Sequence, residues 1–251
     1  MSLSDAELER YARHIVLPQF GGAGQQKLQR ASIAVIGAGG IGSGAIPALA
    51  AAGIGRLTII DDDVVDASNL QRQPIFRDDQ VGGGKAKLAA EFARSINPFV
   101  DAVAGEVRID TGNAPELLAG HDLVLDGSDN FATRLAVSDG CVGLGIPLVS
   151  AAAVQLQGQV GLFRGQPCFR CFVGDAFDSD DCDNCSELGV LGALPLTIGA
   201  FAALIAIRAI AGMGEDSGSL HLLDADRLSW RALRLPADPG CRACGAPAQS
   251  G

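Results

Sequence analysis

A glycine-rich turn in this sequence has the spacing of a loop that approaches phosphate. Its residues, Gly37-Ala-Gly39-Gly40-Ile-Gly42, fit the pattern G-x-G-x-x-G. Glycine lets the backbone turn sharply and come close to a phosphate, and the helix that follows offers free N–H groups. Asp61 ends the next apolar run, where a carboxylate can bind ribose hydroxyls. The pattern predicts a nucleotide site, and on its own it is most often an NAD site.

Cationic and polar side chains follow Asp61, although the chain as a whole is acidic. Arg72 lies in the run Ser68-Asn69-Leu70-Gln71-Arg72-Gln73, and Lys85 follows three glycines. Cations beside a phosphate loop suit a triphosphate whose charge rises during transfer, whereas hydride transfer does not need them. The alternative is a solvated loop followed by a lysine at a helix start.

A third polar group, Asp126-Gly-Ser-Asp129-Asn130, follows a buried apolar run. The carboxyl ends of parallel strands share one sheet edge, so Gly40, Asp61 and Asp129 are expected to meet there. A carboxylate beside an amide suits Mg²⁺, which prefers oxygen ligands. The same residues would also satisfy an Asx turn with a helix cap, and this alternative stays open.

Six of the seven cysteines form three C-x-x-C pairs, Cys168/Cys171, Cys182/Cys185 and Cys241/Cys244. In a chain without an export signal this spacing indicates metal or redox chemistry rather than structural disulfides. A structural zinc site usually takes its four ligands from two such pairs, so only two of the three pairs are needed for one zinc ion. The seventh, Cys141, lies in an apolar helical segment and is expected to fill the core.

Strands that alternate with helices must position these groups. Apolar runs typical of strands are followed by helical segments, with strands expected at 32–36, 57–60, 121–125 and 147–150 and helices at 46–52, 85–95 and 131–144. This order predicts an α/β fold with a doubly wound, Rossmann-like, mainly parallel sheet. Alternating patterns at 154–163 and 219–235 predict that antiparallel strands extend the same sheet.

The N-terminal 30 residues have a different pattern. Ser4 and Glu7 form a capping box before an amphipathic run, which predicts a short helix. A second short helix is expected at 25–30, with the glycines at 21, 22 and 24 in a loop before it.

Composition excludes several classes of function. The chain has 251 residues, 19 basic and 29 acidic, and a net charge of −10, which disfavours binding to nucleic acid or an anionic membrane. The polar N-terminus does not have the pattern of a signal peptide. The apolar run Leu188–Ile207 is interrupted by glycines and Pro195, so we expect a buried core or subunit-interface helix. The expectation is a soluble, cytoplasmic protein.

Taken in order, the motifs resemble the MoeB/ThiF/HesA adenylyltransferases, the bacterial relatives of ubiquitin-activating enzymes. The resemblance runs from about Glu9 to Gly245. It rests on Arg10-Tyr11-x-Arg13-His14, Gly24-Gln25-x-x-Leu28, the glycine loop, Asp61-x-Asp63, Ser68-Asn69-Leu70-x-Arg72-Gln73, Lys85, Asn97-Pro98, Asp126-x-x-Asp129-Asn130 and the C-x-x-C pairs.

This resemblance implies an enzyme that uses MgATP to adenylate the C-terminal glycine of a small ubiquitin-like sulfur-carrier protein. The carrier ends in Gly-Gly, its carboxylate attacks the α-phosphate, and pyrophosphate leaves. The family is dimeric, and a separate protein can donate the sulfur. Molybdenum-cofactor, thiamine and cysteine biosynthesis all use related enzymes, so the motifs do not identify the carrier.

The resemblance also implies roles for individual residues. Gly37, Gly39, Gly40 and Gly42 would approach the phosphates, and Asp61 would hold the ribose. The run Ser68, Asn69, Leu70, Gln71, Arg72 and Gln73 would bind the nucleotide together with Lys85, Asp129 and Asn130, and Asp129 would orient Mg²⁺. Arg13 would reach into the neighbouring subunit's site. Cys185 would belong to a loop over the adenylate and would act, if at all, in sulfur transfer.

For zinc, Cys168, Cys171, Cys241 and Cys244 are preferred, in agreement with the family pattern. Acidic residues surround Cys182 and Cys185, and their charge would oppose a dianionic site with four thiolates and would raise the thiol pKa values.

The expected organisation is one adenylation domain over 1–251. It would comprise N-terminal helices in 1–30, a nucleotide-binding half in 31–150, and an antiparallel, zinc-binding and carrier-binding half in 151–251. Two alternatives are an NAD(P)-dependent oxidoreductase and a non-catalytic, zinc-stapled nucleotide-binding protein.

Overall fold

The computed structural model describes residues 3–174, 189–214 and 217–245. Its centre is an eight-stranded mixed sheet with the order β3-β2-β1-β4-β5-β6-β7-β8. The strands are β1 (Ser32–Ile36), β2 (Arg56–Ile60), β3 (Asp101–Gly105), β4 (Leu123–Asp126), β5 (Leu148–Val154), β6 (Gln157–Phe163), β7 (Ser219–Asp224) and β8 (Ser229–Arg234). The expected mixed sheet is confirmed.

Five strands form the parallel part of the sheet. β1 pairs with β2 and with β4, β2 pairs with β3, and β4 pairs with β5, all in parallel. Every residue of β4 is buried, which explains why its sequence is apolar throughout instead of alternating. The chain order reverses beside β1, between β2 and β4, and ligands bind at such points in doubly wound sheets.

The other strands are antiparallel. β5 and β6 form a hairpin whose turn includes Gln155 at a positive φ of 53°. β7 pairs with β6, and β8 pairs with β7 and forms the edge of the sheet. A single sheet thereby places the end of β5 and the start of β6 next to the carboxyl ends of the parallel strands.

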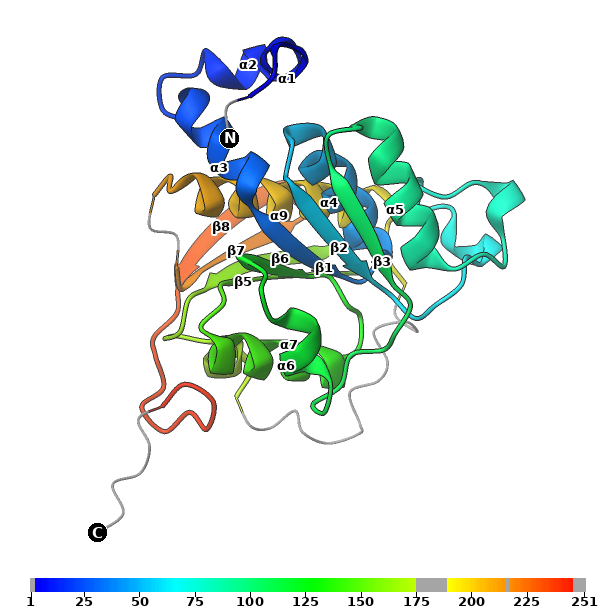
Figure 1. The fold of residues 1–251 in the computed structure, drawn as a ribbon. Coiled ribbons are helices and arrows are strands. Elements are labelled where there is room, and N and C mark those ends of the chain that lie inside the picture. The colour runs from blue at the N-terminus through cyan, green and yellow to red at the C-terminus, as the bar shows by residue number, and fades with distance from the viewer. Residues whose placement is uncertain (1–2, 175–188, 215–216, 246–251) are drawn as a thin grey trace.

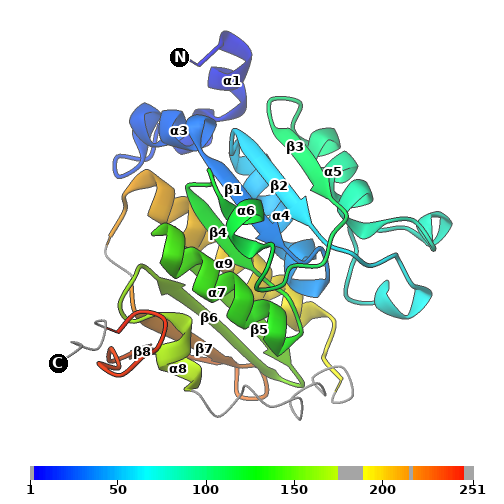
Figure 2. The ribbon, with the colours of Figure 1, turned by 60° about the horizontal axis from the view of Figure 1, so that its bottom comes forward.

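Helices cover both faces of the sheet (Figure 1). On one face lie α4 (Gly40–Ala52), α5 (Lys85–Ile96) and α9 (Ala193–Ala211), and on the other lie α6 (Ala114–Leu118), α7 (Phe131–Leu144) and α8 (Phe169–Val173). Figure 2 shows α7 and α8 in front of the strands, with the C-terminal segment beside α8. Two buried apolar clusters fill the two interfaces between sheet and helices.

Helix α9 is a core helix. Within residues 3–174, 189–214 and 217–245 it is the one helix long and apolar enough to pass a membrane-span test based on length and hydropathy. It packs instead against α4 and the sheet, and Ile198, Ala202 and Ala206 are fully buried. The run was expected to form a helix buried in the core or in a subunit interface, and one side of α9 is buried in the core while Leu204 is 49% exposed.

Helices α4 and α9 lie so close that glycine is required between them. A Cβ atom at Gly44 would collide with the Leu196 carbonyl oxygen, and one at Gly199 would collide with the Ile41 carbonyl oxygen. Gly40, the first residue of α4, also packs against Pro195. The position of α9 therefore determines where the first turn of α4 lies.

Three helices precede the sheet, α1 (Asp5–Arg10), α2 (Ala12–Ile15) and α3 (Gly21–Arg30). The capping box of Ser4 and Glu7 is confirmed. The loop expected at 21–24 is wrong, because these glycines form the first turn of α3. A Cβ atom at Gly24 would come within 2.9 Å of the Phe20 ring, so the ring occupies the space that a side chain would need. The full burial of Gln25 and Leu28 compensates for the weak helix propensity of the glycines.

Candidate functional site

A cavity of about 460 Å³ opens at the carboxyl ends of β1, β2 and β4. Ten of the residues predicted to bind the nucleotide line it, namely Gly37, Gly39, Gly40, Asp61, Asn69, Arg72, Gln73, Lys85, Asp129 and Asn130. These residues come from five separate stretches of the sequence. The expected meeting of Gly40, Asp61 and Asp129 at one sheet edge is confirmed.

The glycine loop joins β1 to α4 by a turn that needs glycine. Gly37 has a positive φ of 86°, and a Cβ atom at Gly42 would collide with the carbonyl oxygen of Gly37. Gly42 therefore lies beneath the loop and is not among the described lining residues. Gly39 is the N-cap of α4, so the first N–H groups of that helix face the cavity without intrahelical partners.

Asp61 fastens the glycine loop to the end of β2. Its Oδ2 accepts a hydrogen bond from the backbone N–H of Ala38 at 2.7 Å, and its Oδ1 accepts one from Asp63 at 2.9 Å. Burial raises the pKa of the Asp61 carboxyl, while these two N–H donors and Lys85 act in the opposite direction. Each oxygen keeps a second lone pair that a ribose hydroxyl could use.

Asn69 organises the polar run after Asp61. Its Oδ1 accepts hydrogen bonds from Arg72 at 2.9 Å and from Gln73 at 3.0 Å. The Arg72 guanidinium also donates to the carbonyl oxygen of Ser68 at 3.2 Å. Arg72 is therefore held in place with its charge at the cavity.

The other three residues of this run, Ser68, Leu70 and Gln71, are outside the described cavity lining. The Ser68 hydroxyl donates to Asp66, which caps the short 3₁₀ helix Ala67–Asn69. Leu70 packs against the larger apolar cluster. Gln71 approaches Gly192, where a Cβ atom would collide with the Gln71 carbonyl oxygen. Their positions indicate that these residues shape the loop.

Lys85 brings a buried cation to the cavity. Its side chain is 6% exposed, and its Nζ lies 2.9 Å from Oδ2 of Asp63, whose side chain is 69% exposed. The lysine begins α5, directly after the N-cap Gly84. An incoming phosphate can compete for Nζ because the present partner is solvated.

The stretch after β4 combines a buried carboxylate with an exposed one. Asp126 is fully buried, and its Oδ1 accepts hydrogen bonds from the backbone N–H and the hydroxyl of Ser128 at 3.0 Å and 2.7 Å. Asp129 is exposed and lines the cavity. Asn130 caps α7 by accepting from the Thr133 N–H at 2.8 Å. The helix-cap alternative is thus correct for Asn130, while Asp129 remains open to the cavity.

The sequence motifs assigned no role to several cavity residues. Asp62 and Asp63 form a compact carboxylate cluster with Asp61, with ligand atoms within 4.8 Å of one another. The segment Val107–Ile109 follows β3 at the same sheet edge, a position that could have been recognised from the strand pattern. Arg134 lines the cavity from α7, and no sequence motif marks it.

A second group of missed residues comes from the antiparallel part of the sheet. Ala152–Val154, Gln157–Gln159 and Leu222 line the cavity. They belong to β5, β6 and β7 and are small, amide-bearing or aliphatic. This end of the cavity can accommodate an extended chain without bulky side chains.

One predicted catalytic residue lies outside the described cavity lining, and another lies outside the described residues. Arg13 is an exposed residue of α2 and is not among the described lining residues. Cys185 and its neighbour Cys182 lie outside the described residues. Cys141 is 2% exposed within the smaller apolar cluster, as expected of core filler.

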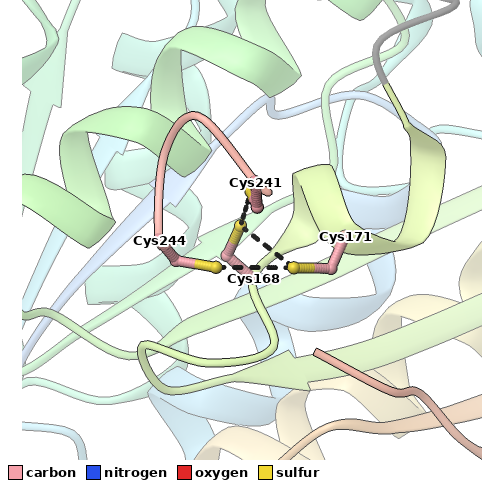
Figure 3. Close-up of side chains that lie close together, drawn as sticks. All are labelled: Cys168, Cys171, Cys241 and Cys244. Atoms are coloured by element: carbon pink, nitrogen blue, oxygen red, sulfur yellow. Dashed lines mark hydrogen bonds between the residues drawn. The ribbon is translucent and has the colours of Figure 1, made fainter. Parts of the chain in front are cut away.

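Cys168, Cys171, Cys241 and Cys244 gather at one point, with their side chains directed toward one another (Figure 3). The Sγ atoms of Cys168 and Cys171 lie 4.0 Å apart, those of Cys168 and Cys241 3.6 Å, and those of Cys171 and Cys244 3.4 Å. The cluster joins α8 to the segment after β8. The predicted pairing of the first and third C-x-x-C pairs is confirmed as a cluster.

The geometry of the four thiols fits zinc. A tetrahedral ion with Zn–S bonds of about 2.3 Å places its sulfurs about 3.8 Å apart, close to the observed separations. Burial raises the pKa of the Cys168 thiol and raises that of Cys244 to about 11. A divalent cation would offset this cost by stabilising the thiolates. The backbone N–H of Asp238 also donates to Sγ of Cys171 at 3.4 Å.

Comparisons with known proteins agree with this geometry. The model of the ThiF family matches residues 11–243. The SAMP-activating enzyme E1 of Haloferax volcanii is 42% identical over 247 residues, covering 98% of this chain and 92% of its own. The molybdopterin-synthase adenylyltransferase of Escherichia coli is 38% identical over 247 residues, covering 97% and 98%.

A solved structure has the same fold. The crystal structure of E. coli MccB with ATP has a TM-score of 0.82 and 22% sequence identity, and the match covers 94% of this chain and 75% of that one. At this identity the likeness establishes the fold.

Proposed function

This chain belongs to the ThiF family, and we propose that it uses ATP to adenylate the C-terminal glycine of a small ubiquitin-like sulfur-carrier protein. One observation carries the proposal. The glycine loop, Asp61, Arg72, Lys85 and Asp129 line a single cavity, although they are far apart in the sequence. The relatives named adenylyltransferases cover nearly the whole chain.

The reaction needs positioning and charge stabilisation rather than a protein nucleophile. The carrier's carboxylate is ionised near neutral pH, so it can attack the α-phosphate without a general base. Its oxygen forms a bond to phosphorus as the bond to the β-phosphate oxygen breaks. The products are an acyl adenylate and pyrophosphate.

The cavity residues divide this work. The start of α4 and the glycine loop would face the phosphates, and Asp61 would hold the ribose. Arg72 and Lys85 would stabilise the charge that grows on the departing pyrophosphate. Asp129, supported by Asn130, would hold Mg²⁺, which neutralises phosphate charge when bound.

The carrier tail would enter the end of the cavity formed by β5, β6 and β7. Gly158 lets this part of β6 pack closely on α9, because a Cβ atom there would collide with Ile198. A Gly-Gly terminus carries no side chains, so it would fit the end of the cavity that Ala152–Val154 and Gln157–Gln159 line. This arrangement would make residues 1–251 one adenylation domain, with the nucleotide bound in 31–150 and the carrier in 151–251.

The four clustered cysteines would hold one structural zinc ion. The set provides four thiolates and no open position, so the metal would stabilise the fold and take no part in adenylation. The ion would tie the segment after β8 to α8.

A homodimer would complete the site. Arg13 lies on an exposed helix and is absent from the described lining of its own chain's cavity. We propose that Arg13 of one protomer reaches the cavity of its partner. Cys185 would act later, in sulfur transfer from a separate donor protein, and the enzyme would work in the cytoplasm.

The alternatives fit the cavity less well. A nicotinamide-dependent oxidoreductase has no need of two cations and a magnesium-binding carboxylate at the phosphate end. A non-catalytic protein would not need to retain every one of these groups.

The test is carrier-dependent ATP–pyrophosphate exchange with each small Gly-Gly-ending protein of the source organism. We expect exchange with at least one carrier, and none when that carrier's terminal glycines are removed. Thermal stabilisation by NAD, with none by MgATP and no exchange with any carrier, would contradict the proposal.

A further inference from the structure

Arg134 lies behind the stretch that carries Asp129, and the proposed adenylation mechanism does not use it. It is in the first turn of α7 and is 7% exposed. Burying a guanidinium is costly unless its charge is compensated. The residues that contact the Arg134 guanidinium therefore indicate which parts of the structure it supports.

The guanidinium connects three elements. Nη2 donates to Oγ of Ser150 in β5 at 2.8 Å, and Nε lies 3.8 Å from Oδ2 of Asp126 at the end of β4. The third contact is with the ring of Phe169, whose centroid is 4.8 Å from the guanidinium carbon. Two strands and the cysteine-bearing helix α8 thus meet at one side chain.

Asp126 links Arg134 to the residues that line the cavity. While Oδ2 faces Arg134, Oδ1 accepts both hydrogen bonds from Ser128. Ser128 directly precedes Asp129, and both residues line the cavity. The chain Arg134–Asp126–Ser128 therefore supports Asp129 from behind.

Phe169 supports Arg134 from the opposite side. It is 1% exposed and lies between Cys168 and Cys171 in the sequence. Its ring contacts Phe131 and Phe163 with centroid separations of 6.2 Å and 5.9 Å. The cysteine cluster and the cavity consequently share this packed aromatic group.

We propose that Arg134 is a positioning residue for adenylation, which holds the Asp129 carboxylate in its metal-binding place through Asp126 and Ser128. The inference rests on the proposed function, because Asp129 is the residue through which Arg134 acts. Outer-shell residues of this kind alter metal affinity or activity by about 10- to 100-fold when they are replaced.

The same helix provides a matched control. Asp139 of α7 forms a bidentate ion pair with Arg170 of α8, at 2.6 Å and 2.8 Å. This second pair also joins α7 to α8, but its two hydrogen bonds run between Asp139 and Arg170 and do not involve the stretch 126–130. Asp139→Asn should lower thermal stability without changing the magnesium requirement.

The experiment compares Arg134→Gln, Arg134→Lys and Asp139→Asn with the wild type as full-length proteins. It measures thermal unfolding, ATP affinity as a function of Mg²⁺ concentration, and KM and kcat for exchange. We expect Arg134→Gln to raise the half-saturating Mg²⁺ concentration about tenfold or more. Arg134→Lys keeps the charge but loses the planar fork, so its shift should be smaller.

The proposal is overturned if Arg134→Gln has the same magnesium requirement and KM for MgATP as Asp139→Asn. Should the glutamine variant fail to fold, Arg134→Lys is compared with the control by the same criterion. A wild-type protein that neither binds MgATP nor catalyses exchange would instead contradict the proposed function. If the wild type is active but Arg134→Gln and Asp139→Asn have the same magnesium requirement and the same KM for MgATP, only the role of Arg134 is overturned.

Discussion

Lys85 and Asp129 bring charges of opposite sign to the cavity. Lys85 is almost buried and now pairs with the exposed carboxylate of Asp63, whereas Asp129 is exposed on the loop after β4. A cation in a poorly hydrated site stabilises growing negative charge more strongly than one in water. Removing either side chain should therefore affect the transition state more than the fold.

We predict that Lys85→Ala and Asp129→Ala each reduce carrier-dependent ATP–pyrophosphate exchange about 10²-fold or more. Lys87→Ala is the control, because Lys87 is exposed on the same helix two residues away and is not among the described cavity residues. It should exchange at the wild-type rate. Near-normal exchange by Asp129→Ala would contradict the proposed magnesium site.

Helices α4 and α9 are held at a separation that only glycine permits. The contacts at Gly44 and Gly199 are with backbone carbonyl oxygens, which cannot rotate away as side chains do. An added methyl group would push α9 from α4 and displace the first turn of α4, which lines the cavity.

We predict that Gly199→Ala destabilises the protein by about 1–3 kcal/mol, the usual cost of overpacking, and weakens ATP binding. Gly143→Ala in α7 is the matched control, because a Cβ atom there would meet no atom within 4 Å. It should stabilise the protein by about 0.5–1 kcal/mol. Chemical denaturation measures both values, and equal effects would show that the close contact is not responsible.

At the level of the whole protein, the proposed zinc site and the proposed dimer connect parts that are distant in the sequence. Cys171 and Cys241 belong to segments on either side of α9, β7 and β8. Arg13 precedes the sheet altogether. Both proposals can be tested without knowledge of the carrier's pathway.

We predict one zinc ion per chain and a large loss of thermal stability when a chelator removes it. Cys241→Ser should bind little zinc, whereas Cys182→Ser should retain it. Metal content is measured by elemental analysis and stability by thermal unfolding. Full zinc content in Cys241→Ser would show that the assigned ligand set is wrong.

Mixed dimers test the composite site. A dimer of one Arg13→Ala chain and one Lys85→Ala chain should regain exchange activity, because one of its two cavities then has both side chains intact. A dimer of one Lys85→Ala chain and one Asp129→Ala chain should stay inactive, because one cavity lacks the Lys85 side chain and the other lacks the Asp129 side chain. Sedimentation that shows a fully active monomer would contradict the proposal.

Much of the fold could be predicted from local pattern. The buried apolar runs of β1, β2, β4 and β5 and the glycine spacing around Gly37 are short-range signals, and they indicated the parallel sheet and its nucleotide edge. The first turn of α3 was missed, because the burial of Gln25 and Leu28 anchors this helix through tertiary contacts, which override glycine's weak helix propensity.

Spacing along the chain identified the residue types that do chemistry, because a phosphate loop, a C-x-x-C pair and a strand-end carboxylate are each local. Their assembly depended on long-range contacts. The meeting of Cys168 with Cys241, the groove of Ala152–Val154 and the hydrogen bond from Arg134 to Ser150 all depend on the sheet order, in which β5 lies beside β4 and β6 lies beside β5. No short-range pattern encodes such distances, because the packing of the whole sheet and its helices determines them.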